Sequence, residues 1–343
     1  MRFTNFAALG LIVAGSVAAS FEIEDQVVYP AQETGQVLRV ISTADRGAFE
    51  PIILAFQSEN QNITVDYTIT STSELMQAIH DEGAVFDLAI SSAMDLQTKL
   101  ANDGFAQTFG AAEMGDLPAW AHWRNQLFAF TQEPAVLVVS DAFFSGSDVP
   151  RTRDELINIL RENPERFRNR VGTYDIRRSG FGYLMATQDS RNSEAFWRLM
   201  EVMGRLEARL YCCSGDMIRD VASGELALAY NVLGSYAASQ SEVIDGFQII
   251  ELEDYVSVML RTALIPTSAE NEADAQKMIN FLLSLDQRPE LSQSSGLPAI
   301  DTTSFQENSA LRPIRFGPGL LVFLDRMRRV TFLRNWESSL VQE

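Results

Sequence analysis

Small polar residues follow five predicted strands of this chain, each at a point where a helical pattern begins. The junctions are Ile41–Asp45, Ile90–Ser92, Ile176–Gly180, Cys213–Asp216 and Tyr230–Ser235. Helix N-termini carry unpaired N–H groups that bind anions, and ligands of open α/β sheets lie beyond the carboxyl ends of the strands. The junctions therefore predict an anion-binding site.

One junction also carries two adjacent arginines, Arg177 and Arg178. A guanidinium group offers two parallel hydrogen bonds to a carboxylate or a phosphate, so we expect one of the two to hold the anionic group. The alternatives are a salt bridge with Asp175 or simple solvation, and any single Ser or Thr could equally be an ordinary helix cap. The predicted ligand-binding residues are Ser42, Thr43, Arg46, Ser91, Ser92, Arg177, Arg178, Ser179, Gly180, Ser214, Asn231 and Tyr236.

The first two junctions lie in a segment in which predicted strands and helices alternate. Val37–Ile41 and Val85–Ile90 are apolar runs typical of buried strands, and Ile63–Ile69 alternates as a half-buried strand does. Helical patterns follow Thr43 and Ser71. This order predicts a parallel sheet with right-handed crossovers.

A second unit of the same kind begins after Pro134. Strands are predicted at 135–139, 171–174 and 225–230, with helices between them. The residues before Pro134 and those near Arg261 are candidates for extended crossings between the two units. Residues 319–332 predict a terminal helix with an apolar and a basic face, expected to dock on the first unit or to bind a partner.

The N-terminus resembles a secretory signal peptide. Arg2 precedes an apolar stretch, and small residues lead to a predicted cleavage site after Ala19. The apolar run is shorter than the ~20 residues of a membrane span, which disfavours an anchor. Residues 20–35 are expected to form an N-terminal arm. The formal charge of −19 opposes binding to nucleic acid.

The chain contains two cysteines, the neighbours Cys212 and Cys213. They cannot join distant parts of the fold. Either they form a disulfide with each other, which an oxidising compartment permits, or they are small apolar side chains at a strand end.

Several segments resemble the bacterial periplasmic solute-binding proteins of ABC transporters, and within them the ferric-iron-type branch. The resemblance rests on Gly224–Ala237, with support from Phe86–Ser92, Glu133–Val136, Ser179–Tyr183 and Ile265–Pro266. It implies the type 2 fold: two α/β lobes, each a mainly parallel sheet flanked by helices, with the ligand in the cleft between them.

The resemblance also implies a division of the chain and a set of partners. Residues 36–132 with 259–343 would form the first lobe and residues 133–258 the second. The expected function is capture of a small anionic solute, such as a sugar phosphate or a polycarboxylate, for an ABC permease in the inner membrane. Some relatives serve a sensor histidine kinase instead, so solute sensing is the alternative.

Two other functions are less compatible with the residues. Iron-binding members of the branch use adjacent tyrosines, whereas this chain has no Tyr-Tyr pair and its two histidines are His80 and His122. An exported enzyme is disfavoured because histidine is scarce and no nucleophile motif such as G-x-S-x-G is present. We therefore expect no metal and no cofactor.

Overall fold

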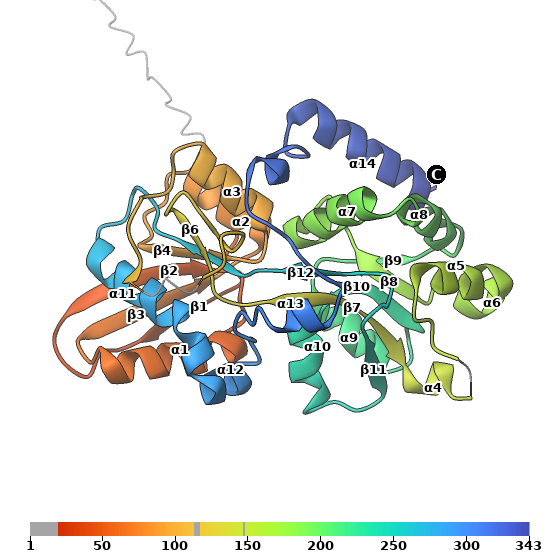
Figure 1. The fold of residues 1–343 in the computed structure, drawn as a ribbon, viewed down its shortest axis with the longest axis horizontal. Helices are drawn as coiled ribbons and strands as arrows, with labels where there is room; N and C mark the ends of the chain where they lie inside the picture. The colour runs from red at the N-terminus through yellow and green to blue at the C-terminus, as the bar shows by residue number, and fades with distance from the viewer. Residues whose placement is uncertain (1–19, 113–116, 147, 343) are drawn as a thin grey trace, which may run out of the picture.

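The computed structural model describes residues 20–112, 117–146 and 148–342. Two sheets, each packed against helices, lie side by side and define two lobes (Figure 1). The predicted signal peptide, residues 1–19, lies outside the described residues. Within the described part of the chain, no helix is long and apolar enough to cross a membrane.

The sheet of the first lobe has the strand order β1-β3-β2-β4-β13-β6-β5. β2 pairs in parallel with β3 and with β4, as the sequence predicts, and the other pairs are antiparallel. Its strands are β1 (Asp25–Tyr29), β2 (Gln36–Ser42), β3 (Ile63–Ile69), β4 (Leu88–Ser91), β5 (His122–Trp123), β6 (Leu127–Ala129) and β13 (Thr262–Leu264). The segment predicted as an N-terminal arm thus contributes a strand, β1, which packs Tyr29 into the core.

The helices of this lobe enclose a core in which Phe49, Ile52 and Phe56 are fully buried, as their helical spacing predicts. The helices of the first lobe are α1 (Arg46–Glu59), α2 (Thr72–Met76), α3 (Met94–Asn102), α11 (Glu272–Leu283) and α12 (Pro289–Ser295). The Ser71 hydroxyl accepts the Glu74 N–H at the start of α2, which is the predicted cap.

The sheet of the second lobe has the order β14-β12-β7-β10-β8-β9, with β11 paired to β7. β10, β8 and β9 are parallel to one another, whereas β7 runs antiparallel to β10, β11 and β12. Its strands are β7 (Glu133–Ser140), β8 (Val171–Tyr174), β9 (Arg209–Tyr211), β10 (Leu228–Leu233), β11 (Phe247–Ile250), β12 (Val256–Met259) and β14 (Leu311–Pro313). Each lobe therefore combines a group of three parallel strands with antiparallel strands; the parallel group lies inside the first sheet and at one end of the second.

The helices of the second lobe are α4 (Asp141–Phe144), α5 (Arg153–Glu162), α6 (Pro164–Phe167), α7 (Gly180–Asn192), α8 (Ala195–Arg205), α9 (Ser214–Ala222), α10 (Gly234–Ser241) and the terminal α14 (Arg326–Leu340). α14 lies over α7 and α8 (Figure 1). The expectation that the terminal helix docks on the first lobe is wrong, because Phe332, Trp336 and Leu340 join the apolar core of the second.

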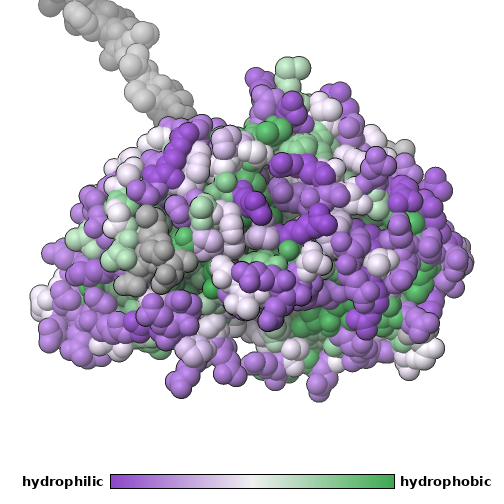
Figure 2. All heavy atoms as spheres, in the orientation of Figure 1, coloured by the Kyte–Doolittle hydropathy of each residue, from purple (hydrophilic) through white to green (hydrophobic). Residues whose placement is uncertain are grey.

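The chain passes between the sheets in extended segments. It crosses from β6 to β7, returns from β12 to β13, and leaves the first lobe again between α12 and β14, a stretch that contains α13 (Ser304–Glu307). The first two crossings are those predicted near Pro134 and Arg261. Figure 2 shows that most of the visible face is hydrophilic, with hydrophobic residues visible in the furrow between the lobes.

Candidate functional site

Four predicted residues meet at the ends of β2 and β4, close to where the first lobe contacts the second, and we call this edge the first wall of the interlobe cleft. The Thr43 hydroxyl accepts the Ser92 N–H at 3.1 Å. Ser42 and Ser91 are buried, and each accepts the N–H two residues ahead. These hydroxyls organise the turns into α1 and α3, so the N-termini of both helices open on the same side of the sheet.

The second wall combines the ends of β8 and β10 with the start of α9. The hydroxyls of Tyr174 and Ser214 are hydrogen-bonded, and Leu233 donates its N–H to the Ser214 hydroxyl at 3.4 Å. The Tyr236 hydroxyl, in the first turn of α10, accepts the Asp45 N–H at 3.1 Å. Because Asp45 is the residue immediately before α1, this bond joins the helix N-termini of the two lobes.

Further hydrogen bonds join the lobes beside α2 and α7. Gly180 donates its N–H to the Thr72 hydroxyl at 2.9 Å, and the Ser73 hydroxyl donates to the Arg178 carbonyl at 3.2 Å. Ser179 caps α7 by accepting the Gly182 N–H. The predicted residues Ser179 and Gly180 therefore lie where the lobes touch.

Three predicted arginines lie apart from the cluster of hydroxyls. Arg46 is exposed and pairs with Glu50 one turn along α1. The Nε and Nη2 groups of Arg177 donate to the two carboxylate oxygens of Asp175 at 2.8 and 2.7 Å, and its Nη1 lies 3.7 Å from Glu337 of α14. The side chain of Arg178 is exposed, and its backbone carbonyl accepts the Ser73 hydroxyl of the first lobe. The salt bridge with Asp175, considered above as the alternative, is the arrangement that Arg177 adopts.

The predicted residue Asn231 also points away from the cleft. It adopts a positive φ of 62° and donates its side-chain N–H to Asp189 at 2.7 Å. Asp189 further accepts the hydroxyls of Tyr230 and Tyr255 and lies 3.6 Å from Arg153. This buried network stabilises the second lobe.

Sequence reasoning missed a group of buried residues at the base of the cleft. Tyr67 donates to the Ser42 hydroxyl at 2.8 Å. On the crossing segments, Arg261 and Glu133 form a fully buried ion pair, and the Ser235 hydroxyl donates to Glu133. The sequence did contain a signal for this pair, because Glu133 and Arg261 are each the single charged residue of an apolar stretch. Charged side chains are rarely buried unless they are paired.

The tyrosines of the cleft keep their protons at neutral pH. Burial raises the pKa of Tyr67 and Tyr174 well above the ordinary value for tyrosine, and it raises the pKa of Tyr236 to about 12. Tyr67 already donates its proton to Ser42, whereas Tyr236 accepts the Asp45 N–H and so keeps its own proton to donate to another acceptor.

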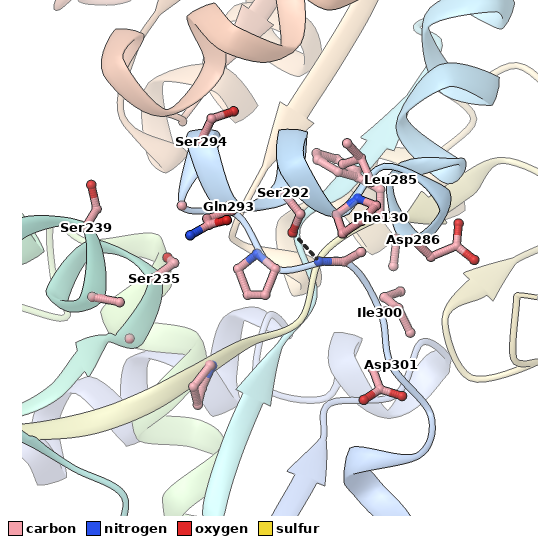
Figure 3. Close-up of a pocket in the computed structure, with 18 of the residues that line it drawn as sticks. Phe130, Ser235, Ser239, Leu285, Asp286, Ser292, Gln293, Ser294, Ile300 and Asp301 are labelled. Carbon is pink, nitrogen blue, oxygen red and sulfur yellow. Dashed lines mark hydrogen bonds between the residues drawn. The ribbon is translucent and has the colours of Figure 1, made fainter. Parts of the chain in front are cut away.

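A large cavity lies between the two lobes, lined by α10 of the second lobe, α12 of the first and the crossing segments (Figure 3). Its volume is about 990 Å³. Ser235 and Ser239 face it from α10, and Ser292 and Gln293 from α12 (Figure 3). Its charged lining residues are all acidic: Glu242, Glu251, Asp286 and Asp301. An anion is therefore served better by the helix N-termini of the cleft than by this cavity.

The cysteines lie at the edge of the second wall. Cys212 and Cys213 are bonded to each other and exposed, and Cys213 precedes the first residue of α9. Of the two alternatives considered for this pair, the structure contains the disulfide.

Asp95 of α3 lies in a groove between the lobes that also contains Arg329 of α14. Burial raises its pKa to about 7, against weaker opposing effects of the Leu96 N–H and Arg329. Because the folded protein then binds a proton that the unfolded chain releases near pH 4, stability should fall as the pH rises from about 4 to 7. Asp95→Asn should therefore raise Tm clearly at pH 8 and by a smaller amount at pH 5. Equal changes at both pH values would contradict this.

The comparisons with known proteins agree with this architecture. Residues 38–294 match the family model described as bacterial extracellular solute-binding protein. The substrate binding protein of an ABC transporter from Agrobacterium tumefaciens is 33% identical, with a TM-score of 0.88 over 94% of this chain and 100% of its own. No curated protein matches the chain.

More distant solved structures share the fold alone. AfuA from Actinobacillus pleuropneumoniae, with exogenous fructose-6-phosphate bound, is 13% identical, with a TM-score of 0.70 over 90% of this chain and 99% of its own. Iron-bound HitA from Pseudomonas aeruginosa is 15% identical, with a TM-score of 0.67 over 88% and 99%. From the family match and its 33% identical relative, the chain belongs to the bacterial extracellular solute-binding proteins, the two-lobed periplasmic receptors of ABC transporters.

Proposed function

We propose that this protein captures a small organic anion, a phosphate ester such as a sugar phosphate or a polycarboxylate, and delivers it to an ABC permease in the inner membrane. The observation that carries the proposal is the meeting of helix N-termini from both lobes. Asp45 at the start of α1 bonds to Tyr236 at the start of α10. Ser92 and Ser214 mark the starts of α3 and α9 on the two walls.

The chemistry of these groups favours an anion over the other solutes of related folds. N-terminal N–H groups, serine hydroxyls and neutral tyrosines are hydrogen-bond donors, and aligned peptide dipoles add partial positive charge. A sugar phosphate occupies the relative AfuA, whereas HitA holds iron. The Tyr236 hydroxyl, which accepts the Asp45 N–H and keeps its own proton to donate, supports the first kind of solute for this chain.

A thermal-shift panel tests the proposal on purified protein freed of solute by partial unfolding and refolding. Glucose 6-phosphate, glycerol 3-phosphate and citrate are compared with glucose, glycerol and ferric nitrilotriacetate. At least one of the anions should raise Tm, because a ligand at 100 times its Kd stabilises the folded state by about 2.7 kcal/mol. Stabilisation by ferric iron or a neutral compound, with none by the anions, would contradict the proposal.

A further inference from the structure

The Arg261 guanidinium is an unusual group in this structure because it is fully buried and one of its nitrogens has no partner. Its exposed fraction is 0%. Nε and Nη2 donate to the two oxygens of Glu133 at 2.9 and 3.0 Å. Nη1 is buried with no hydrogen-bond acceptor. A buried donor without a partner costs about 1–3 kcal/mol, so such a group calls for an explanation.

Glu133 cannot supply the missing acceptor. Its Oε1 accepts the Thr131 hydroxyl at 2.8 Å as well as Arg261 Nε, and its Oε2 accepts the Ser235 hydroxyl as well as Arg261 Nη2. A carboxylate offers about four acceptor positions, so all of them are used. The carboxylate fixes the guanidinium in one orientation and leaves the N–H groups of Nη1 for another acceptor.

The surroundings of Arg261 identify where that acceptor would lie. Ser235, which shares Glu133 with Arg261, immediately precedes Tyr236 in the first turn of α10. The positive charge of Arg261 lowers the pKa values of Tyr236 and Asp45, against the larger raising effect of burial. Both residues belong to the contact that closes the cleft between α1 and α10. Thr262, the next residue along the chain, pairs with Ser91 at the end of β4, so Arg261 lies where the end of β4 meets the start of α10, next to that contact.

We propose that Nη1 of Arg261 is the cationic anchor for the solute's anionic group, a part that the sequence had suggested for Arg177 or Arg178. With the lobes apart, an anionic oxygen reaches Nη1, and closure of α1 and α10 over it then completes the site. The inference rests on the proposed function and makes it more specific. Because Arg261 lies on a crossing segment, occupation of Nη1 also places the anion at the hinge of the two lobes.

Asp45, at the contact between α1 and α10, narrows the class of solute. Its carboxylate is exposed and can accept hydrogen bonds from donors on a ligand. An anion that also carries hydroxyl groups can bind Arg261 through its anionic group and donate a hydrogen bond from a hydroxyl to Asp45. The two side chains together favour a hydroxylated anion, such as a sugar phosphate or a hydroxy acid, over a bare anion such as inorganic phosphate.

Arg261→Lys tests the anchor, and Arg153→Lys is its matched control. Lysine keeps the positive charge beside Glu133 but loses the forked nitrogens. Arg153 is also a buried arginine in an ion pair, but its nitrogens are taken by Tyr230, Tyr255, Asp254 and Asp189 in the second lobe. Titration calorimetry with glucose 6-phosphate, glycerol 3-phosphate and citrate should show binding weakened about 10- to 100-fold in Arg261→Lys. The control should stay within threefold of wild type.

Variants that fail to fold are replaced by a second design. Arg261→Met combined with Glu133→Gln removes both charges, keeps an acceptor for Ser235, and should show the same loss of affinity. Wild-type affinity in either folded Arg261 variant would overturn the anchor while leaving the proposed function intact. Failure of wild-type protein to bind any of the three anions would overturn both. Inorganic phosphate binding as tightly as the best of them would overturn the requirement for hydroxyl groups.

Discussion

Replacing Gly180 with alanine is expected to weaken solute binding about tenfold or more while leaving the free protein as stable as wild type. A Cβ at this position would lie 2.6 Å from the Thr72 hydroxyl oxygen and 3.1 Å from a methyl carbon of Leu96. Both neighbours belong to the first lobe, whereas Gly180 begins α7 of the second. The added methyl group therefore obstructs contact between the lobes, and overpacking of this kind costs about 1–3 kcal/mol.

The effect should appear in binding because a solute held between two lobes gains affinity from closure. A substitution that makes the closed form less favourable reduces the apparent affinity by the same factor. Gly110→Ala is the matched control, since Gly110 is exposed and an added Cβ would meet nothing within 4 Å. Titration calorimetry with the best anion of the panel measures both variants. Equal affinity in Gly180→Ala and Gly110→Ala would show that this contact does not form in the bound state.

Asp189→Ala is expected to lower the free energy of unfolding of the second lobe by about 3–5 kcal/mol. Asp189 is fully buried and accepts hydrogen bonds from Tyr230, Asn231 and Tyr255. Its removal leaves the buried Arg153 with Asp254 as its remaining carboxylate, 3.0 Å away and partly exposed. A buried charge that loses its counter-charge is costly because the protein interior solvates it poorly.

Asp154→Ala provides the comparison for this prediction. Asp154 pairs with Arg198 at 2.9 Å, but both side chains are largely exposed, so the loss should be below about 1 kcal/mol. Urea unfolding followed by the fluorescence of Trp197 and Trp336, both of which lie in or against the second core, compares the variants with wild type. Losses of similar size in the two variants would mean that burial of Asp189 adds little to the stability of this lobe.

Much of the fold could be predicted because it depends on local patterns. Apolar runs and alternation located β2, β3 and β7, and helical spacing located α1, since burial imposes these periods on the sequence. The position of α14 depended on which apolar surface lay nearest in space. Phe332 and Trp336 fit the second core, and nothing local to their sequence distinguishes that core from the first.

The candidate site was predicted less completely for a similar reason. The positions of Ser42, Ser92 and Ser214 between a strand and a helix could be predicted because each lies at the end of its own strand pattern. Arg261 and Glu133 are separated by 128 residues and meet where two crossing segments come together. The sequence instead drew attention to Arg177, whose guanidinium is taken by Asp175 two residues earlier.

The most direct test of the central claim is to identify the solute that the protein itself retains. Protein exported in its native host is purified without unfolding, and native mass spectrometry followed by analysis of the released compound gives the mass and charge of the solute. We expect a single small anion bearing phosphate or carboxylate groups together with hydroxyls, lost from Arg261→Lys under the same conditions. Release of iron or of an uncharged sugar would contradict the claim that this cleft binds an anion.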